Sequence, residues 1–171
     1  FEYFSAKGGD KQIAYRDFLT FGGMPRILSL NSDREKADYL KRLFTETYIR
    51  DIRERHNIEH PEVLEGIIDF ISSNIGSLSN PRQIASHFKN VSEGTVRTYI
   101  DYLKDAFLFS ESQRYDVKGK RYFSYPQKYY CEDLGLRNAR LNFRQQELTH
   151  LMENAIYNEL RIRGYSVDVG V

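Results

Sequence analysis

The fold is decided by residues 81–121, which read PRQIASHFKNVSEGTVRTYIDYLKDAFLFSESQRYDVKGKR. Asn80-Pro81 opens a short helix, and Ser92 opens a longer amphipathic one. From Phe107 the apolar period becomes that of strands, and Lys118-Gly119-Lys120 offers a glycine where a hairpin turn needs a positive φ. Helix, turn, second helix and basic hairpin together predict a winged helix-turn-helix, a module that docks on nucleic acid or on a protein partner.

Helical patterns flank this stretch on both sides. Ser32 and Glu35 have the spacing of a capping box, which marks the start of a long amphipathic helix. The apolar period predicts helices over residues 32–55, 61–75 and about 145–163, followed by a strand over 165–171. The sequence therefore predicts a mainly α-helical protein with a small β-sheet, of the α+β class.

Composition excludes several classes of protein. The net charge is only +1, so any anion-binding surface must be local; residues 111–131 carry five basic and two acidic side chains. A single cysteine, Cys131, excludes an internal disulfide framework and fits a reducing cytoplasm. No apolar run reaches the ~18 residues of a membrane span, and the N-terminus lacks a signal pattern. We expect a cytoplasmic protein without membrane contacts. Because the sequence begins at Phe1 and not at a methionine, we also expect it to be a piece of a longer chain.

The candidate nucleic-acid contacts lie on the second helix and on the hairpin. They are Arg97, Thr98, Arg114, Lys118, Lys120 and Arg121. The helix presents three acids beside its two candidates, and carboxylates repel phosphate, so it is a poor surface for reading bases. The basic hairpin is the better surface. We therefore expect weak or sequence-independent contact with duplex DNA, with docking on a protein as the alternative.

Motifs for catalysis and cofactors are incomplete. Gly119-Lys120 is followed by Arg121 and not by the Ser or Thr of a phosphate-binding loop. His56 and His60 are four residues apart, but Pro61 interrupts a shared helix and no third ligand is near. Cys131 has no neighbouring His, so we expect a buried, inert thiol. We expect no cofactor and no metal in this part of the protein.

Glu153 is the one weak catalytic candidate. A Glu on a helix that precedes carboxylate-bearing strands is the order found in metal-dependent nucleases, where carboxylates hold the divalent ion. The later carboxylate and the Lys of that pattern are missing here. We therefore expect Glu153 to cap or bridge within its own helix.

Six segments together resemble one family. They are Arg50-Asp51-Ile52, Asn74-Ile75-Gly76, Thr95–Leu103, Arg114–Lys120, Asp133–Asn138 and Glu153–Tyr157. In this order and spacing they are similar to the C-terminal domain that follows the ATPase core in many predicted bacterial and archaeal AAA-type P-loop ATPases. The resemblance runs from about Gly22 to the end of the chain. It implies an upstream ATPase core, which would use ATP and Mg²⁺.

The resemblance also implies three regions. Residues 1–60 would be a helical region belonging to the lid of the ATPase, and residues 61–125 the winged helix-turn-helix. Residues 126–171 would be the truncated start of a restriction-endonuclease-like domain, without its second carboxylate-bearing strand after Gly170. Its active-site set is often incomplete in this family, so we expect an accessory region that is not catalytic by itself. A stand-alone winged-helix DNA-binding protein and part of a metal-dependent nuclease are the alternatives.

The terminal strand predicts an assembly. Tyr165, Val167 and Val169 alternate along an edge that has no evident partner in the sequence, and such an edge is a template for pairing. We expect it either to form a homodimer or to dock on the chain's own strand at Tyr129–Cys131.

Overall fold

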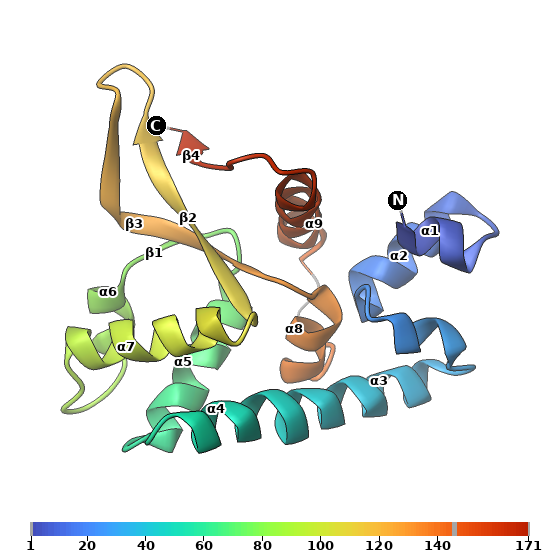
Figure 1. Cartoon of the computed structure of the whole chain (residues 1–171), viewed down its shortest axis with the longest axis horizontal. Helices are drawn as coiled ribbons and strands as arrows, with labels where there is room; N and C mark the ends of the chain where they lie inside the picture. The colour runs from blue at the N-terminus through green and yellow to red at the C-terminus, as the bar shows by residue number, and fades with distance from the viewer. Residues whose placement is uncertain (1, 145–146, 171) are drawn as a thin grey trace.

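The computed structural model describes residues 2–144 and 147–170 and confirms the α+β class. Helices make up most of the chain, and one small sheet lies beside them with its hairpin projecting outward (Figure 1). In chain order the elements are α1 (Glu2–Lys7), α2 (Lys11–Phe21), the 3₁₀ helix η1 (Pro25–Ser29), α3 (Asp33–Arg42), the π-helix η2 (Leu43–Ile49), α4 (Arg50–Arg55), α5 (Pro61–Ser73), β1 (Leu78–Ser79), α6 (Pro81–Ala85), α7 (Glu93–Asp105), β2 (Phe109–Asp116), β3 (Arg121–Cys131), α8 (Leu134–Arg140), α9 (Leu148–Ile162) and β4 (Val169–Gly170).

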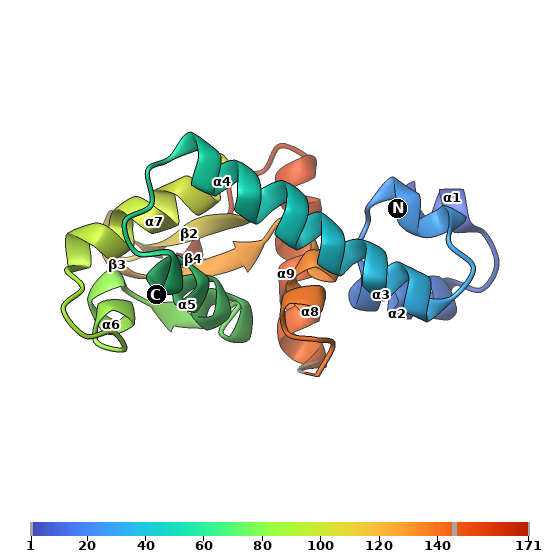
Figure 2. The ribbon, with the colours of Figure 1, turned by 90° about the horizontal axis from the view of Figure 1, so that it is seen from below.

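One long helical rod, made of α3, η2 and α4, runs along one side of the molecule (Figures 1 and 2). The predicted capping box begins it: the Ser32 hydroxyl accepts from the Glu35 N–H at 3.2 Å, and the Glu35 carboxylate accepts from the Ser32 N–H at 3.1 Å. Leu40, Phe44 and Ile52 are buried in the core. The helix expected over residues 32–55 is confirmed, but its middle is π-helical, a wider turn that the apolar period does not reveal.

The sheet has the strand order β1-β3-β2-β4. β2 and β3 form the expected hairpin, with Phe109 opposite Cys131, and β1 pairs antiparallel with β3. The helices before it begin where the sequence predicts. The Asn80 side chain accepts from the N–H of Gln83 at 2.7 Å and caps α6, and Ser92 caps α7 in the same manner.

The hairpin differs from expectation in two details. The strand expected at Tyr129–Cys131 is not separate from the hairpin but is the end of β3, which continues from Arg121. The positive φ of the turn, +50°, belongs to Lys120 and not to Gly119. A Cβ at Gly119 would lie 2.4 Å from the Asp116 carboxylate, so a larger residue there would displace the group that accepts the N–H groups of the turn.

The end of the chain pairs with a strand other than the expected one. Of residues 165–170, only Val169 and Gly170 form a strand; Val171 lies outside the described residues. β4 pairs parallel with β2, Val169 opposite Arg114, and not with Tyr129–Cys131. The reason is that β3 is already occupied on both edges, by β1 and by β2, so β2 supplies the free edge.

A junction at the start of α8 joins it to the N-terminal helices. The Asp133 carboxylate caps α8 by accepting from the Leu136 N–H at 3.0 Å, and it also accepts from the Gly23 N–H at 2.8 Å. The backbones of α8 and of the end of α2 approach so closely here that a Cβ on Gly135 would lie 2.0 Å from the Phe21 carbonyl oxygen. The first turn of α8 therefore receives the end of α2.

The second half of the junction consists of two buried polar side chains. Asn138 donates to the carbonyls of Leu19 at 2.9 Å and Thr20 at 2.8 Å, and so ties α8 to α2. Arg137 donates to the Ser72 carbonyl at 2.8 Å, which ties α8 to α5. Because α8 contacts elements from distant parts of the chain, it holds the N-terminal helices against the rest.

The core is one buried apolar cluster that reaches from Leu19 on α2 to Leu151 on α9. The expected boundaries between three regions stay a prediction; that at residue 125 falls inside β3. α9 begins at Leu148, and the expected start at Gln145 lies outside the described residues. In the described part of the chain, no helix has both the length and the apolar character that crossing a membrane requires.

Candidate nucleic-acid interface

The β2–β3 hairpin projects from the body of the molecule and carries its turn at the far end (Figure 1). The turn is held from within. The Asp116 carboxylate accepts from the Lys118 N–H at 3.0 Å and from the Gly119 N–H at 2.9 Å. Hydrogen bonds of an Asp to the backbone a few residues later stabilise such turns. The tip is therefore defined by its own sequence and needs no support from the core.

Four of the six predicted contacts lie on this hairpin. Lys118 and Lys120 are exposed at the tip, and neither forms an ion pair with any described residue. Arg121 lies 3.8 Å from the Asp116 carboxylate, a long and solvent-exposed pair. Arg114 lies on β2, a few residues before the turn. The structure thus brings these four cationic side chains onto one hairpin, as predicted.

One face of the hairpin combines cations with an aromatic ring. The Arg114 guanidinium carbon lies 5.7 Å from the centre of the Phe123 ring, and that of Arg121 lies 5.0 Å from it. Contacts of this kind hold a guanidinium in place while leaving its N–H groups free to donate. This face can therefore present two fixed cations to a phosphate backbone.

The other face of the hairpin carries tyrosines, which sequence reasoning missed. Tyr115 and Tyr122 are cross-strand neighbours, with ring centres 4.9 Å apart and planes tilted by 52°. The Tyr122 hydroxyl donates to the Asp168 carboxylate at 3.0 Å, and this bond, together with the negative charge of Asp168, raises the pKa of the phenol. The repeated Arg-Tyr pairs, Arg114-Tyr115 and Arg121-Tyr122, were the signal, because strand neighbours point to opposite faces.

The two remaining predicted contacts lie on α7, away from the tip. The eight residues of β2 separate the end of α7 from the turn, roughly 26 Å at strand geometry. Arg97 is paired with Glu93 at 2.5 Å, and the Thr98 hydroxyl donates to the Gly94 carbonyl at 3.1 Å. Asp101 stays exposed beside them. The structure does not bring Arg97 and Thr98 together with the basic tip, and their polar groups are engaged within the helix.

Glu153 contacts β3, whereas the sequence suggested a cap or a bridge within its own helix. Its carboxylate accepts from the Lys128 ammonium at 2.8 Å and from the Tyr130 hydroxyl at 2.7 Å. Burial raises the pKa of Glu153, but these two hydrogen bonds outweigh it and hold the pKa below its ordinary value. No cluster of three or more metal-binding side chains is present in residues 2–144 and 147–170.

The neighbouring Asn154 is fully buried and acts on the last residue of β3. Its amide oxygen accepts from the Cys131 N–H and its amide nitrogen donates to the Cys131 carbonyl, both at 2.8 Å. Asn158 donates to the same carbonyl at 2.9 Å. Glu153 and Asn154 thus attach α9 to the strand that carries the hairpin.

The histidines and the cysteine that the sequence offered as candidates, His56, His60 and Cys131, do not form a site. α4 ends at Arg55, so His56 and His60 do not share a helix face; the His56 ring stacks on Tyr102 with centres 3.6 Å apart. Cys131 is buried, as expected, and burial raises the pKa of its thiol.

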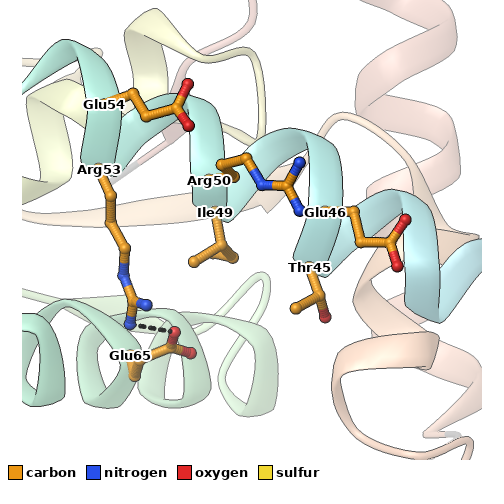
Figure 3. A pocket seen from close by; sticks show the side chains of 7 residues that line it. All are labelled: Thr45, Glu46, Ile49, Arg50, Arg53, Glu54 and Glu65. Atoms are coloured by element: carbon orange, nitrogen blue, oxygen red, sulfur yellow. Dashed lines mark hydrogen bonds and ion pairs between the residues drawn. The ribbon is translucent and has the colours of Figure 1, made fainter.

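A shallow hollow of 420 Å³ lies between the long rod and α5 (Figure 3). Arg53 points across it to Glu65, and the two side chains form an ion pair of 3.1 Å. Arg50, Glu46 and Glu54 also border it. Because acids and bases are mixed around this open surface, it favours no single charge of ligand.

Comparison with known proteins gives a family but no activity. The chain is 32% identical over 178 residues to an "Uncharacterized protein" of Haemophilus influenzae, an alignment that covers 99% of this chain and 44% of the relative. It is 29% identical over 153 residues to an uncharacterized protein of Methanocaldococcus jannaschii, covering 87% of this chain and 34% of that relative. The chain thus spans less than half the length of these curated relatives.

No solved structure gives a significant match. Neither the names of these relatives nor the family description mentions an ATPase, so the resemblance to the AAA-type C-terminal domain stays a prediction. Residues 12–147, most of the chain, match the family described as a domain of unknown function, DUF8612. The chain belongs to this DUF8612 family.

Proposed function

We propose that this chain is a non-catalytic accessory region that contacts nucleic acid through the β2–β3 hairpin. The observation that carries the proposal is the tip: Lys118 and Lys120 are exposed and form no ion pair with described residues, and Arg114 and Arg121 lie on the same hairpin. Cations that neutralise phosphates supply most of the affinity of sequence-independent binding. In a protein whose net charge is only +1, these side chains give the hairpin a local positive charge.

The binding we propose is to the backbone and not to base edges. Base readout requires free Arg, Asn or Gln side chains on an element that enters a groove. On α7 the Arg97 guanidinium is paired with Glu93, and Asp101 adds a negative charge. The element order α5-β1-α6-α7-β2-β3 supports a winged helix-turn-helix. We propose that its wing binds and its helix does not.

The hairpin is best tested by charge reversal. Lys118→Glu with Lys120→Glu should abolish binding of a labelled DNA duplex at low salt, measured by fluorescence anisotropy. The control is Lys41→Glu with Arg42→Glu, which makes the same change of charge at exposed positions of α3. Wild-type affinity should also fall steeply as salt is added, because protein binding releases counterions from the DNA and added salt opposes that release. Absence of binding at low salt, or equal loss in both variants, would overturn the proposal.

We also propose that the region works within a larger ATPase. The support is the resemblance of six segments to the C-terminal domain of AAA-type ATPases, together with relatives more than twice as long as the matched stretch. The ATPase core would then be the partner, it would bind ATP and Mg²⁺, and the assembly would be cytoplasmic. This chain's sequence has no phosphate-binding loop, so titration of the isolated chain with labelled ATP and Mg²⁺ should show no binding. Stoichiometric binding would contradict this assignment.

Two alternatives make different predictions. A stand-alone winged-helix DNA-binding protein would discriminate strongly between duplex sequences, which competition with unrelated duplexes measures. A metal-dependent nuclease would need Glu153 free for a divalent ion, whereas its carboxylate is engaged by Lys128 and Tyr130. That engagement favours the non-catalytic proposal.

A homodimer through the terminal strand is the last partner we propose. β4 lies at one end of the strand order, paired with β2 alone among described strands, so its second edge is open for pairing. Light scattering should give a dimer for the full chain and a monomer after removal of residues 165–171. A monomer in both cases would rule the dimer out.

A further inference from the structure

We propose that Tyr115 and Tyr122 form a stacking platform for an unpaired base, so that the hairpin prefers nucleic acid with a single-stranded segment. This inference rests on the proposed function and adds the class of nucleic acid. The two tyrosines lie on the face of the hairpin opposite to Arg114 and Arg121, and both faces meet at the lysine-bearing tip. A strand bound by the lysines can therefore reach the tyrosines with a base.

Exposure is the first argument. Tyr122 is 58% exposed although it sits within a paired strand, and Tyr115 beside it is half-buried. Their ring centres are 4.9 Å apart and their planes are tilted by 52°, so the rings adjoin without being coplanar, and a flat base would stack on the more exposed Tyr122. A cross-strand pair that served only to stabilise the hairpin would gain most by covering both rings. Here the outer ring remains largely open to solvent.

Fixed orientation is the second argument. The Tyr122 hydroxyl donates to Asp168 at 3.0 Å, and the segment that carries Asp168 is itself held, because the Ser112 hydroxyl donates to the Val167 carbonyl at 2.7 Å. The ring is thereby restrained before a ligand arrives, which reduces the entropy lost on binding. Asp168 is also an acid at the rim, so phosphates should stay at the lysine tip while the base occupies the ring.

The chemistry of the ligand follows from the geometry. Bases within a duplex stack on one another and have no free face for a protein ring. Stacking on an exposed tyrosine therefore selects unpaired bases, and it tolerates any sequence because every base has a π-face. The expected ligand is a single strand, or a junction whose duplex backbone contacts the tip while a neighbouring unpaired base reaches Tyr122.

The chain contains no tryptophan, which allows a site-specific probe. The variant Tyr122→Trp should show emission that is quenched when a short thymidine oligonucleotide binds. The variant Phe107→Trp, at an exposed aromatic position near the other end of β2, should bind equally and show no quenching. A 5-methyluridine oligonucleotide, which has the same base on a ribose, tested in parallel decides whether the sugar matters; quenching by either one supports the platform.

Affinity measurements separate the ring from the hydroxyl. Tyr122→Ala should weaken binding of the single strand by roughly ten-fold and leave duplex binding unchanged. Tyr122→Phe keeps the ring and loses only the bond to Asp168 that restrains it, so it should bind more weakly than wild type but more tightly than Tyr122→Ala. If Tyr122→Ala does not fold, the tryptophan and phenylalanine variants still decide.

Failure of this inference is distinguishable from failure of the proposed function. Three results together would overturn the platform and leave the proposal for the lysine tip intact. They are equal affinity for single strand and duplex, no quenching in the Tyr122→Trp variant, and no effect of Tyr122→Ala on binding. If Tyr122→Ala weakens duplex binding as much as single-strand binding, the platform is also overturned, because Tyr122 would then have a purely structural role. Absence of any binding at low salt would remove both proposals.

Discussion

The tip of the β2–β3 hairpin and the start of α8 are both built around an aspartate that accepts backbone N–H groups. At the tip, Asp116 accepts from N–H groups two and three positions later, and the turn around it is exposed. At α8, Asp133 accepts from both Leu136 and Gly23, which is 110 residues away. Both belong to segments that resemble the same family. Only the tip leaves charged groups free for a ligand; the junction uses its polar groups to hold the fold.

The largest effect should come from the junction. Gly135→Ala would place a Cβ 2.0 Å from the Phe21 carbonyl oxygen, which is backbone and cannot move aside cheaply. We expect a loss of about 3 kcal/mol or more in unfolding free energy, or no folding at all. Urea denaturation followed by circular dichroism measures it. Gly94→Ala is the matched control: a Cβ there meets only the Ser92 hydroxyl at 3.5 Å, and alanine should stabilise α7 slightly.

The attachment of α9 should show the next largest effect. Asn154→Ala leaves both the N–H and the carbonyl of buried Cys131 without the amide of Asn154. Unsatisfied buried groups cost about 1–3 kcal/mol each, partly offset here because Asn158 also donates to the carbonyl. Thermal unfolding measures the loss, with exposed Asn57→Ala as the control. Equal stability of the two variants would mean that α9 is held by its apolar face alone.

Glu153 should make a smaller, pH-dependent contribution. Its pKa is held below the ordinary value of 4.5, so the native state prefers the charged carboxylate. The stability from Glu153 is therefore present above pH 4.5 and lost as the pH falls through the lowered pKa. Because the side chain is 39% exposed, solvent screening limits this contribution to under about 1 kcal/mol.

The variant Glu153→Gln tests the sign of this effect. It should be less stable than wild type at neutral pH and should lose less stability on acidification, as acid titration of the circular dichroism signal would show. Identical acid sensitivity of the two proteins would mean that the contact with Lys128 and Tyr130 does not favour the charged form.

The smallest effect on stability should come from the tip. Lys118→Ala with Lys120→Ala removes side chains that form no ion pair with described residues, so unfolding should change by no more than about 0.5 kcal/mol. The same variant should lose nucleic-acid binding. A loss of stability comparable to that of Asn154→Ala would mean that the tip, too, serves the fold, and the contrast between the two regions would disappear.

The features that could be predicted from the sequence are those whose partners are local. Ser32, Asn80 and Ser92 cap helices through groups three residues away, so spacing alone reveals them. The basic hairpin could be predicted for the same reason, since its residues are neighbours across one turn. The backbone of that turn could not, because the positive φ lies at Lys120 and the Asp116 carboxylate occupies the space that a Cβ at position 119 would take.

The features that escaped prediction depend on partners far along the chain. Asn138 bonds to the end of α2 from 119 residues away, and no local pattern marks that pairing. Glu153 on α9 bonds to Lys128 of β3, 25 residues away. β4 pairs with β2 because β1 and β2 lie along the two edges of β3. The sequence shows Arg and Tyr alternating along the hairpin, which places the tyrosines on one face. It does not show that Tyr122 is exposed or that its hydroxyl bonds to Asp168.

The bond from Gly23 to Asp133 also sets an order for protein synthesis. Chains grow at about 5–20 residues per second, so the 110 residues between these partners take roughly 5–22 seconds to translate. During that time α2 has been made without the helix against which it packs, and its apolar side chains Leu19 and Phe21 are open to chaperones and proteases. The N-terminal helices therefore precede the rest of this chain in synthesis but must wait for α8 before they reach their native position.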